Sequence, residues 1–230
     1  MHKASELSPV DKALRQRAEW ILDTAGVGKY FKKGGAYLDI GTGKGHITQL
    51  ALEDMEKLGK PLKMYAGIDV ADKPLKKVQK RESARKDMGT AAKSEEENSM
   101  NFAWASADAL PYGEGSFDGA SFFFSIHHMN KENIDKAIEE AKRVIKKDGH
   151  IFITEDLVGD EEQRKITEEV DRKLNWESEE DEHNYRSDEQ WEEYFREKGL
   201  EVVEKRFFES QSKKGPIKHG SYILKLKEEK

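Results

Sequence analysis

Three glycines, Gly41, Gly43 and Gly45, alternate with other residues directly after an apolar stretch that carries Asp39. Glycine accepts positive φ and has no Cβ, so the backbone of such a turn can approach a ligand closely. Apolar residues at helical spacing follow at positions 47–58. A strand, a glycine turn and a helix in this order are typical of a nucleotide-binding loop, although a plain tight turn uses glycines as well.

A second apolar stretch, residues 64–70, carries Asp69 near its end. In an open α/β sheet, an acid at this place can accept hydrogen bonds from the hydroxyls of a ribose. An acid at a strand end is also a common N-cap of the following helix, which is the alternative interpretation.

Two further motifs follow a third strand pattern. The motif D-A-L-P begins at Asp108, and the motif S-F-D begins at Ser116. A fourth apolar run follows and ends shortly before the pair His127 and His128. Together with the glycine loop and the acid after the second strand, this order of motifs resembles the class I S-adenosylmethionine-dependent methyltransferases, particularly the small-molecule group of the type 11 kind. The resemblance is close over residues 36–156, although D-A-L-P is one residue tighter than the family's pattern.

The resemblance implies how the cofactor is bound. Asp39 would hold its ammonium group, directly or through water, and Asp69 would bind its ribose. Asp108 would accept a hydrogen bond from the adenine amino group, while the amide of Ala109 reaches a ring nitrogen. S-adenosylmethionine carries positive charge on its sulfonium and ammonium groups, so acidic side chains favour its binding. A pyrophosphate is instead bound by basic side chains or by free backbone amides. The implied cofactor-binding positions are Asp39, Gly41, Thr42, Gly43, Gly45, Asp69, Val70, Asp108, Ala109 and Ser125.

The methyl acceptor is expected at the carboxyl ends of the fourth and fifth strands, because open parallel sheets bind ligands there. His127 matches the first histidine of the family's pair, and we expect it to face the transferred methyl group. Positioning of the acceptor can suffice for methyl transfer; if the acceptor is a hydroxyl or an acidic carbon, His127 would also act as a general base. His128 and Asp156 are the other catalytic candidates. Consecutive side chains diverge, so one histidine of the pair would face the methyl group; a packing or capping pair is the alternative. We expect no metal site.

Strand and helix patterns alternate along the chain, which predicts one α/β domain. We expect a Rossmann-like, doubly wound, seven-stranded sheet, mostly parallel with an antiparallel last strand and with helices on both faces. The predicted strands are 37–40, 64–70, 101–105, 117–125, 150–154, 200–209 and 219–227, and the predicted helices include 47–58, 131–147 and 187–199.

Three parts of the domain are expected: a helical cap at 1–33, a cofactor-binding core at 34–156, and a C-terminal part at 157–230. The cap would cover the pocket, with Tyr30 and Phe31 in its wall, or would merely pack on the sheet. In the C-terminal part, the acidic segment that includes His183 and Tyr185 lies where related enzymes place a substrate lid. A solvated surface is the alternative for such a charge run.

Composition excludes several chemistries. The 230 residues contain no Cys, which excludes thiolate attack and disulfides. The formal net charge of -6 disfavours nucleic acid as a substrate. No stretch has the length of a signal peptide core or a membrane span, so we expect a cytoplasmic protein, a monomer or homodimer, that acts on a small molecule. A non-catalytic S-adenosylmethionine-binding partner or sensor and an NAD-type oxidoreductase are the alternative functions.

Overall fold

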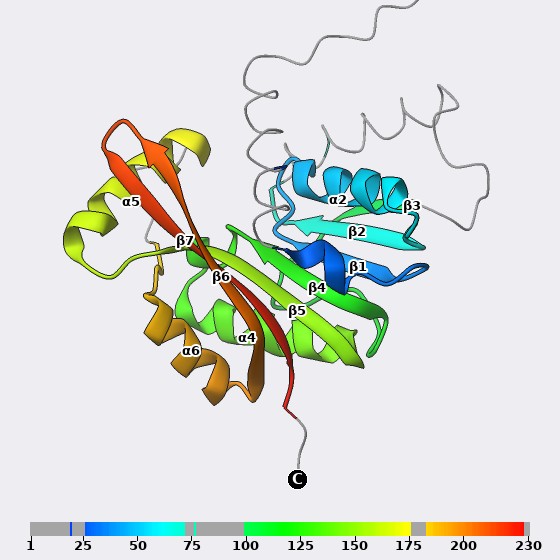
Figure 1. The fold of residues 1–230 in the computed structure, drawn as a ribbon. Helices are drawn as coiled ribbons and strands as arrows, with labels where there is room; N and C mark the ends of the chain where they lie inside the picture. Colours follow the sequence, from blue (N-terminus) through cyan, green and yellow to red (C-terminus); the bar gives the residue numbers. More distant parts are fainter. Residues whose placement is uncertain (1–18, 20–25, 72–75, 77–98, 176–182, 228–230) are drawn as a thin grey trace, which may run out of the picture.

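A computed structural model describes residues 19, 26–71, 76, 99–175 and 183–227 (Figure 1). The strands are β1 (Ala36–Ile40), β2 (Met64–Asp69), β3 (Ser99–Trp104), β4 (Phe117–Phe123), β5 (Ile145–Leu157), β6 (Leu200–Ser212) and β7 (Gly215–Leu226). They form one sheet in the order β3-β2-β1-β4-β5-β7-β6. The pairs among β1 to β5 are parallel, and β7 runs antiparallel to both β5 and β6. The predicted seven-stranded, Rossmann-like sheet with an antiparallel last strand is confirmed.

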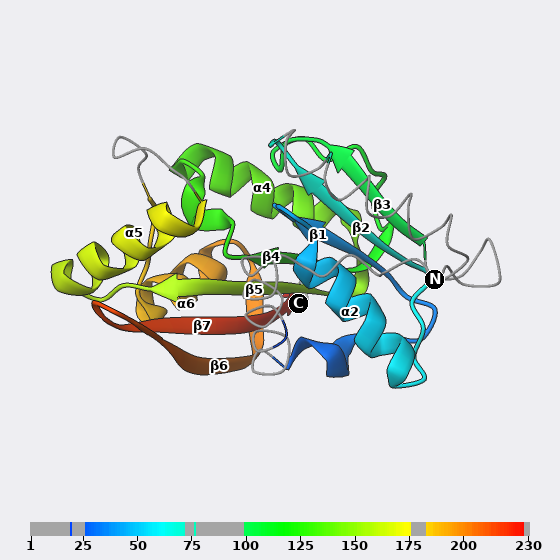
Figure 2. The ribbon, with the colours of Figure 1, turned by 90° about the horizontal axis from the view of Figure 1, so that it is seen from above.

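Helices cover both faces of this sheet. The helical elements are η1 (Val27–Tyr30), α2 (His46–Lys57), η2 (Ile126–His128), α4 (Lys131–Val144), α5 (Glu161–Asn175) and α6 (Asp188–Glu197). Seen from above, α2 and α4 lie on opposite faces (Figure 2). The helices on both faces match the predicted doubly wound fold.

The two faces have separate cores because side chains alternate along each strand. On one face, Leu38 of β1 belongs to a cluster with buried residues of α4 and α6, among them Ile138 and Phe195. On the other face, Tyr37 packs with η1 and α2 through Val27 and Leu50. Strands buried on both faces read as continuous apolar runs, which is why β1 and β4 were recognisable in the sequence.

Several boundaries differ from the prediction. The helix expected over 131–147 ends at Val144, and β5 begins at the next residue, five positions before the expected strand. The hairpin of β6 and β7 is longer than expected, and Gly215 and Pro216 lie in β7 instead of in the connecting loop. The exposed side of β6 is strongly charged, so the apolar pattern underestimates its length. None of the predicted helices corresponds to α5.

None of the helices in the described part of the chain combines the length and the hydropathy that a membrane span requires. Most of the expected helical cap, 1–18 and 20–25, and the first part of the acidic segment, 177–182, lie outside the described residues.

Candidate functional site

The glycine loop joins β1 to α2. Gly41 has a φ of 79°, and a Cβ there would lie 2.5 Å from the Cβ of Ser125. Gly43 has a φ of 52°, and a Cβ there would meet none of the described atoms within 4 Å. The amides of Gly41 and Thr42 both donate to the carbonyl of Ile68 on β2. The loop is therefore fixed against β2, while its central glycine faces open space.

Asp39 supports this loop from inside the sheet and is only 2% exposed. Its two oxygens accept hydrogen bonds from Thr48 at 2.7 Å and Ser121 at 3.0 Å. Burial raises the pKa of Asp39, and the hydroxyl donors oppose this shift. Asp39, one of the predicted cofactor-binding residues, is therefore hydrogen-bonded to hydroxyl groups of the protein itself.

Asp69, at the end of β2, connects two turns. One carboxylate oxygen accepts a hydrogen bond from the amide of Gly43, and the other accepts one from the amide of Ala71, both at 2.7 Å. The bond to the residue two positions later is typical of an Asx turn. Asp69 therefore holds the glycine loop and the turn after β2 at one place.

A cavity of 790 Å³ opens at the carboxyl ends of the parallel strands. This volume lies within the range of about 300 to 1,000 Å³ that is usual for small-molecule sites. Within the described ranges, the acidic residues of its lining are Asp69 and Asp108, and neither Lys nor Arg lines it. The predicted positions that line the cavity are Gly41, Gly43, Asp69, Val70, Asp108 and Ser125; Asp39, Thr42, Gly45 and Ala109 are not among the lining residues.

Phe124 marks the point where β4 turns towards η2. Its φ of 54° is the only positive value at a non-glycine residue in the described part of the chain. Such a conformation costs about 1 to 3 kcal/mol and persists only where the surroundings enforce it. The amide of Phe124 donates to the carbonyl of Thr154, which fixes the turn against β5. The strained turn directs Ser125 and η2 to the cavity.

The end of the cavity next to η2 is polar. Asn184 holds the segment before α6 against η2, because its amide donates to the carbonyl of His127 at 2.8 Å. Its side chain also donates to the carbonyl of Met129 at 2.6 Å. The polar side chains at this end are His128, Asn130, Asn133, His183 and Asn184.

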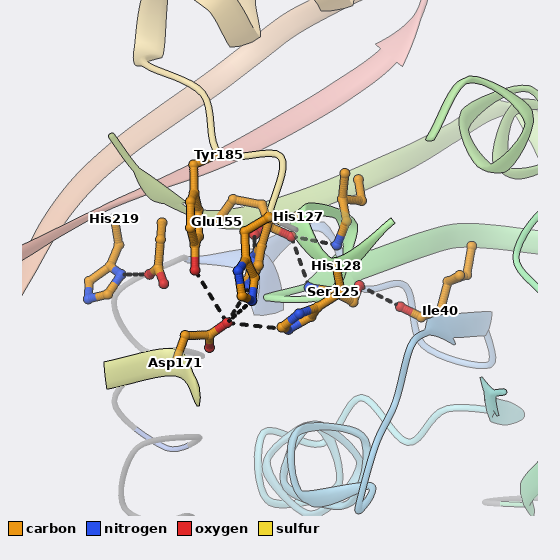
Figure 3. Close-up of polar contacts among 11 residues, drawn as sticks. Ile40, Ser125, His127, His128, Glu155, Asp171, Tyr185 and His219 are labelled. Atoms are coloured by element: carbon orange, nitrogen blue, oxygen red, sulfur yellow. Dashed lines mark hydrogen bonds and ion pairs between the residues drawn. The ribbon is translucent and has the colours of Figure 1, made fainter. Parts of the chain in front are cut away.

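His127 lies between two carboxylates and is 1% exposed. Its Nδ1 is hydrogen-bonded to Glu155, and its Nε2 lies 3.1 Å from Oδ2 of Asp171 (Figure 3). Burial disfavours the imidazolium, but the charges of Glu155 and Asp171 raise the pKa of His127 well above its usual value. His127 is not a lining residue of the cavity. The expected position of His127 is therefore corrected, because the carboxylates hold its ring below the cavity wall.

His128, the second histidine of the pair, lines the cavity. Its Nε2 lies 3.7 Å from Oδ2 of Asp171, and Nε2 of His183 lies 3.3 Å from the same atom. The hydroxyl of Tyr185 donates to Oδ2 of Asp171 at 3.3 Å, and burial raises the pKa of Tyr185. Burial would raise the pKa of Asp171, but the hydrogen bond with His127 and the charges of the three histidines lower it.

Asp156 belongs to a different group of side chains. Its Oδ1 lies 2.5 Å from Nδ1 of His219 on β7, and Nε2 of His219 lies 2.7 Å from the hydroxyl of Ser210. Asp156 is 4% exposed and does not line the cavity. The structure thus separates this third catalytic candidate from His128.

Tyr30 and Phe31 do not line the cavity either. Phe31 is 2% exposed and packs against Tyr37, with ring centroids 4.3 Å apart. The hydroxyl of Tyr30 donates to Glu204 on β6 at 2.7 Å. These aromatic residues pack on the sheet, as the alternative interpretation of the N-terminal segment stated.

No motif of the sequence marks Asp171. The residue lies on α5 and reaches His127 across 44 positions of the chain. A weak signal exists, because Ile166, Val170 and Leu174 repeat every four residues and predict an amphipathic helix. Such a pattern gives no indication of which side chain the helix brings to η2.

The fold and the cavity define a class of protein: a doubly wound α/β protein with a cavity at the carboxyl ends of its strands, the place where such sheets bind ligands. The chain belongs to the methyltransferase domain family, whose model matches residues 12–205. The resemblance to class I S-adenosylmethionine-dependent methyltransferases is confirmed by this match and by the fold.

Solved structures with the same fold have low sequence identity to this chain. An S-adenosylmethionine-dependent methyltransferase from Methanosarcina mazei is 20% identical with a TM-score of 0.64, and the match covers 88% of this chain and 97% of that chain. A putative sarcosine dimethylglycine methyltransferase from Galdieria sulphuraria is 17% identical with a TM-score of 0.63, covering 96% and 91%. The [4+2]-cyclase SpnF is 16% identical with a TM-score of 0.65, covering 94% and 82%.

These similarities establish the fold and leave the reaction to be argued from the site, since one fold supports different chemistries. No curated protein matches the chain at a significant level of sequence similarity.

Proposed function

We propose that the protein transfers a methyl group from S-adenosylmethionine to a small-molecule acceptor. The observation that carries this proposal is the two-ended cavity. One end is lined by the glycine loop and by two acids after successive strands, and the other by histidine and asparagine side chains. A cofactor and an acceptor can meet inside such a cavity.

The residues at the first end fit S-adenosylmethionine. The open space at Gly43 accepts a ligand against the backbone, and a Cβ would occupy that space. Asp69 would bind the ribose hydroxyls and Asp108 the adenine amino group. Bound there, S-adenosylmethionine supplies an electrophilic methyl group on a sulfonium. Asp39 would contribute to cofactor binding indirectly, by holding the glycine loop in place.

Charge favours this cofactor over a dinucleotide. Asp69 and Asp108 line the cavity, and no Lys or Arg of the described residues does so. A diphosphate would meet two carboxylates without a cationic partner, whereas a sulfonium cation is favoured by them. This argues against the NAD-type oxidoreductase.

At the second end, His128 is the side chain best placed to act on the acceptor. It is 27% exposed and lines the cavity, so a proton on the acceptor can reach it. Asn130 and Asn133 would orient the acceptor by hydrogen bonds. Proximity alone can supply about 7 to 11 kcal/mol of the barrier, and a base adds roughly 10² to 10⁴ in rate.

Calorimetry with S-adenosylhomocysteine and with NADH tests the cofactor. We expect S-adenosylhomocysteine to bind and NADH to bind at least tenfold more weakly. Asp69→Ala should weaken S-adenosylhomocysteine by about 1.5 to 3 kcal/mol, roughly 10- to 150-fold. Asp148→Ala is the matched control, because Asp148 pairs with Lys32 outside the cavity lining. Tighter binding of NADH would overturn the proposal.

Incubation with methyl-labelled cofactor and a panel of metabolites tests catalysis. Transfer of label to a small molecule is the expected result. If label is transferred to an added nucleic acid or protein but to no compound of the panel, the proposal of a small-molecule acceptor is overturned. Binding without transfer to any of these would instead support the non-catalytic alternative.

A further inference from the structure

Three histidine nitrogens gather around one carboxylate oxygen at the acceptor end of the cavity. Oδ2 of Asp171 lies 3.1 Å from Nε2 of His127, 3.3 Å from Nε2 of His183 and 3.7 Å from Nε2 of His128. The donor atoms of His127, His128 and Asp171 lie within 4.8 Å of one another. Figure 3 shows His127 and His128 directed towards Asp171. The four side chains come from three separate segments: η2, α5 and the segment before α6.

Glu155 determines which nitrogen of His127 faces this group. Its Oε1 accepts hydrogen bonds from the amides of Ser125 and Ile126, at 2.9 and 2.8 Å. Its other oxygen is hydrogen-bonded to Nδ1 of His127. This contact leaves Nε2 of His127 directed towards Oδ2 of Asp171, at 3.1 Å.

The distances suit a metal ion. Around a tetrahedral ion with ligand bonds of about 2.1 Å, neighbouring donor atoms are about 3.4 Å apart. The separations of Oδ2 of Asp171 from Nε2 of His127 and of His128, 3.1 and 3.7 Å, lie on both sides of this value. A histidine ligand whose other ring nitrogen donates to a carboxylate is also the usual arrangement at metal centres. Glu155 supplies this carboxylate to His127.

We propose that His127, His128 and Asp171 bind a divalent transition metal ion, such as Zn²⁺, at the acceptor end of the cavity. Two imidazoles and one carboxylate form a donor set for borderline ions and leave a position open for a further ligand, whereas Mg²⁺ requires oxygen ligands. This proposal departs from the expectation of no metal site. The ligand set is formed only by the tertiary contact of α5 with η2.

This ion would face the methyl acceptor. His128 and His183 line the cavity, whereas His127 is buried behind them. An ion bound by His127, His128 and Asp171 has the cavity on one side, where an oxygen of the acceptor can reach it. On the basis of the proposed methyl transfer, the acceptor would therefore carry an oxygen donor close to the atom that receives the methyl group. Nε2 of His128 is then a metal ligand, so the ion would take over the role that His128 has as a base in the metal-free site.

Metal binding is measured on the untagged full-length chain, without any acceptor. After treatment with a chelator, the protein is dialysed against Co²⁺ or Zn²⁺, and bound metal is determined by elemental analysis. The expected result is one ion per chain, with the visible absorption of Co²⁺ bound to nitrogen donors. Mg²⁺ at the same concentration should not displace it. A wild-type chain that binds less than a tenth of an equivalent, with no change of melting temperature, overturns the proposal.

Three variants locate the ion. His128→Ala and Asp171→Ala should each weaken Co²⁺ binding at least tenfold. Glu155→Gln should weaken it about 10- to 100-fold, the usual loss for the partner of a metal-bound histidine. The glutamine oxygen can still accept from the two amides, while its NH₂ group would donate to Nδ1 of His127 and place a proton on Nε2. His150→Ala is the matched control, since His150 stacks on Phe152 away from the three ligands.

Unchanged Co²⁺ affinity in all three variants, each checked for cooperative unfolding, would overturn the site even if the wild type binds metal. Loss of affinity in His150→Ala to the same extent would do so as well. S-adenosylhomocysteine binding on the same preparations separates this proposal from the cofactor assignment. Asp69→Ala should lose the cofactor and keep the metal, so failure of either proposal leaves the other testable.

Discussion

Gly43 and Gly59 have similar backbone conformations, with φ of 52° and 69°, and at neither would a Cβ meet a described atom within 4 Å. Alanine in the left-handed region costs about 1 to 2 kcal/mol at either position. Only Gly43 lines the cavity. We therefore expect Gly43→Ala and Gly59→Ala to lose similar stability, while only Gly43→Ala weakens S-adenosylhomocysteine binding, by about tenfold or more.

Denaturant unfolding and calorimetry on the two variants separate these effects. If Gly59→Ala lost cofactor affinity as strongly as Gly43→Ala, the effect would come from strain in general and the glycine loop would have no special role.

The two adjacent histidines should respond differently to substitution. His127→Ala leaves Glu155 and Asp171 buried without the ring between them, and breaking such a pair costs about 3 to 5 kcal/mol. His128 is partly exposed at the cavity wall, so His128→Ala should cost less than about 1 kcal/mol of stability but lower kcat. Unfolding free energies and turnover with an acceptor from the panel check this order. A larger stability loss in His128→Ala would contradict it.

At the residue scale, the positions that line the cavity were predictable where they belong to a local motif. Gly41, Gly43 and Asp69 each follow a strand at a spacing that can be read along the chain. His127 and His128 were placed correctly after β4, but their order of burial depends on the turn at Phe124, which has no sequence signal.

At the element scale, η1 is attached to β6 through Glu204. The carboxylate of Glu204 pairs with Lys29 and accepts hydrogen bonds from Tyr30 and Arg206, each at 2.7 Å. These contacts, with Lys29 first, lower the pKa of Glu204 from 4.5 to about 2. Because the pKa is lower in the folded state, the stabilisation is present above about pH 4.5 and is lost as the pH falls towards 2.

Glu204→Gln should therefore reduce the free energy of unfolding at neutral pH by about 0.2 to 1 kcal/mol, the usual contribution of partly exposed ion pairs. The difference from wild type should shrink as the pH falls from 4.5 towards 2. Glu201→Gln is the control, because Glu201 is 54% exposed and its Lys225 partner lies 3.5 Å away. A difference that stayed constant down to pH 2 would show that charge has no part in the effect.

Elements with a clear period were predictable, and elements that depend on neighbours were less so. α4 and α6 show apolar residues at helical spacing, and both exist close to the predicted bounds. β6 alternates exposed and half-buried residues along its whole length, and charged side chains hide this pattern. α5 has an acid, Asp171, on its buried side, where a simple apolar pattern would require a hydrophobic residue.

At the scale of the whole molecule, the two cores and the cavity are properties of one continuous sheet. The alternation of strand and helix patterns allowed a mostly parallel, doubly wound sheet to be predicted, whereas the order of its strands was not predicted. The convergence of η2, α5 and the segment before α6 was not predictable. It depends on how two helical elements and one connecting segment pack at one end of the sheet.

A ligand that binds across this end of the sheet should stabilise the entire domain. Binding to the native state alone adds about 2.7 kcal/mol when the ligand is at 100 times its Kd. In a chain of this size, 1 kcal/mol shifts Tm by about 2 to 4 °C, so S-adenosylhomocysteine should raise Tm by roughly 5 to 11 °C. NADH, which we expect to bind at least tenfold more weakly, should add no more than about 1.4 kcal/mol at the same concentration and raise Tm by at most about 3 to 6 °C. Thermal unfolding followed by calorimetry checks both, and an equal rise with NADH would mean that the carboxylates of Asp69 and Asp108 do not select the cofactor.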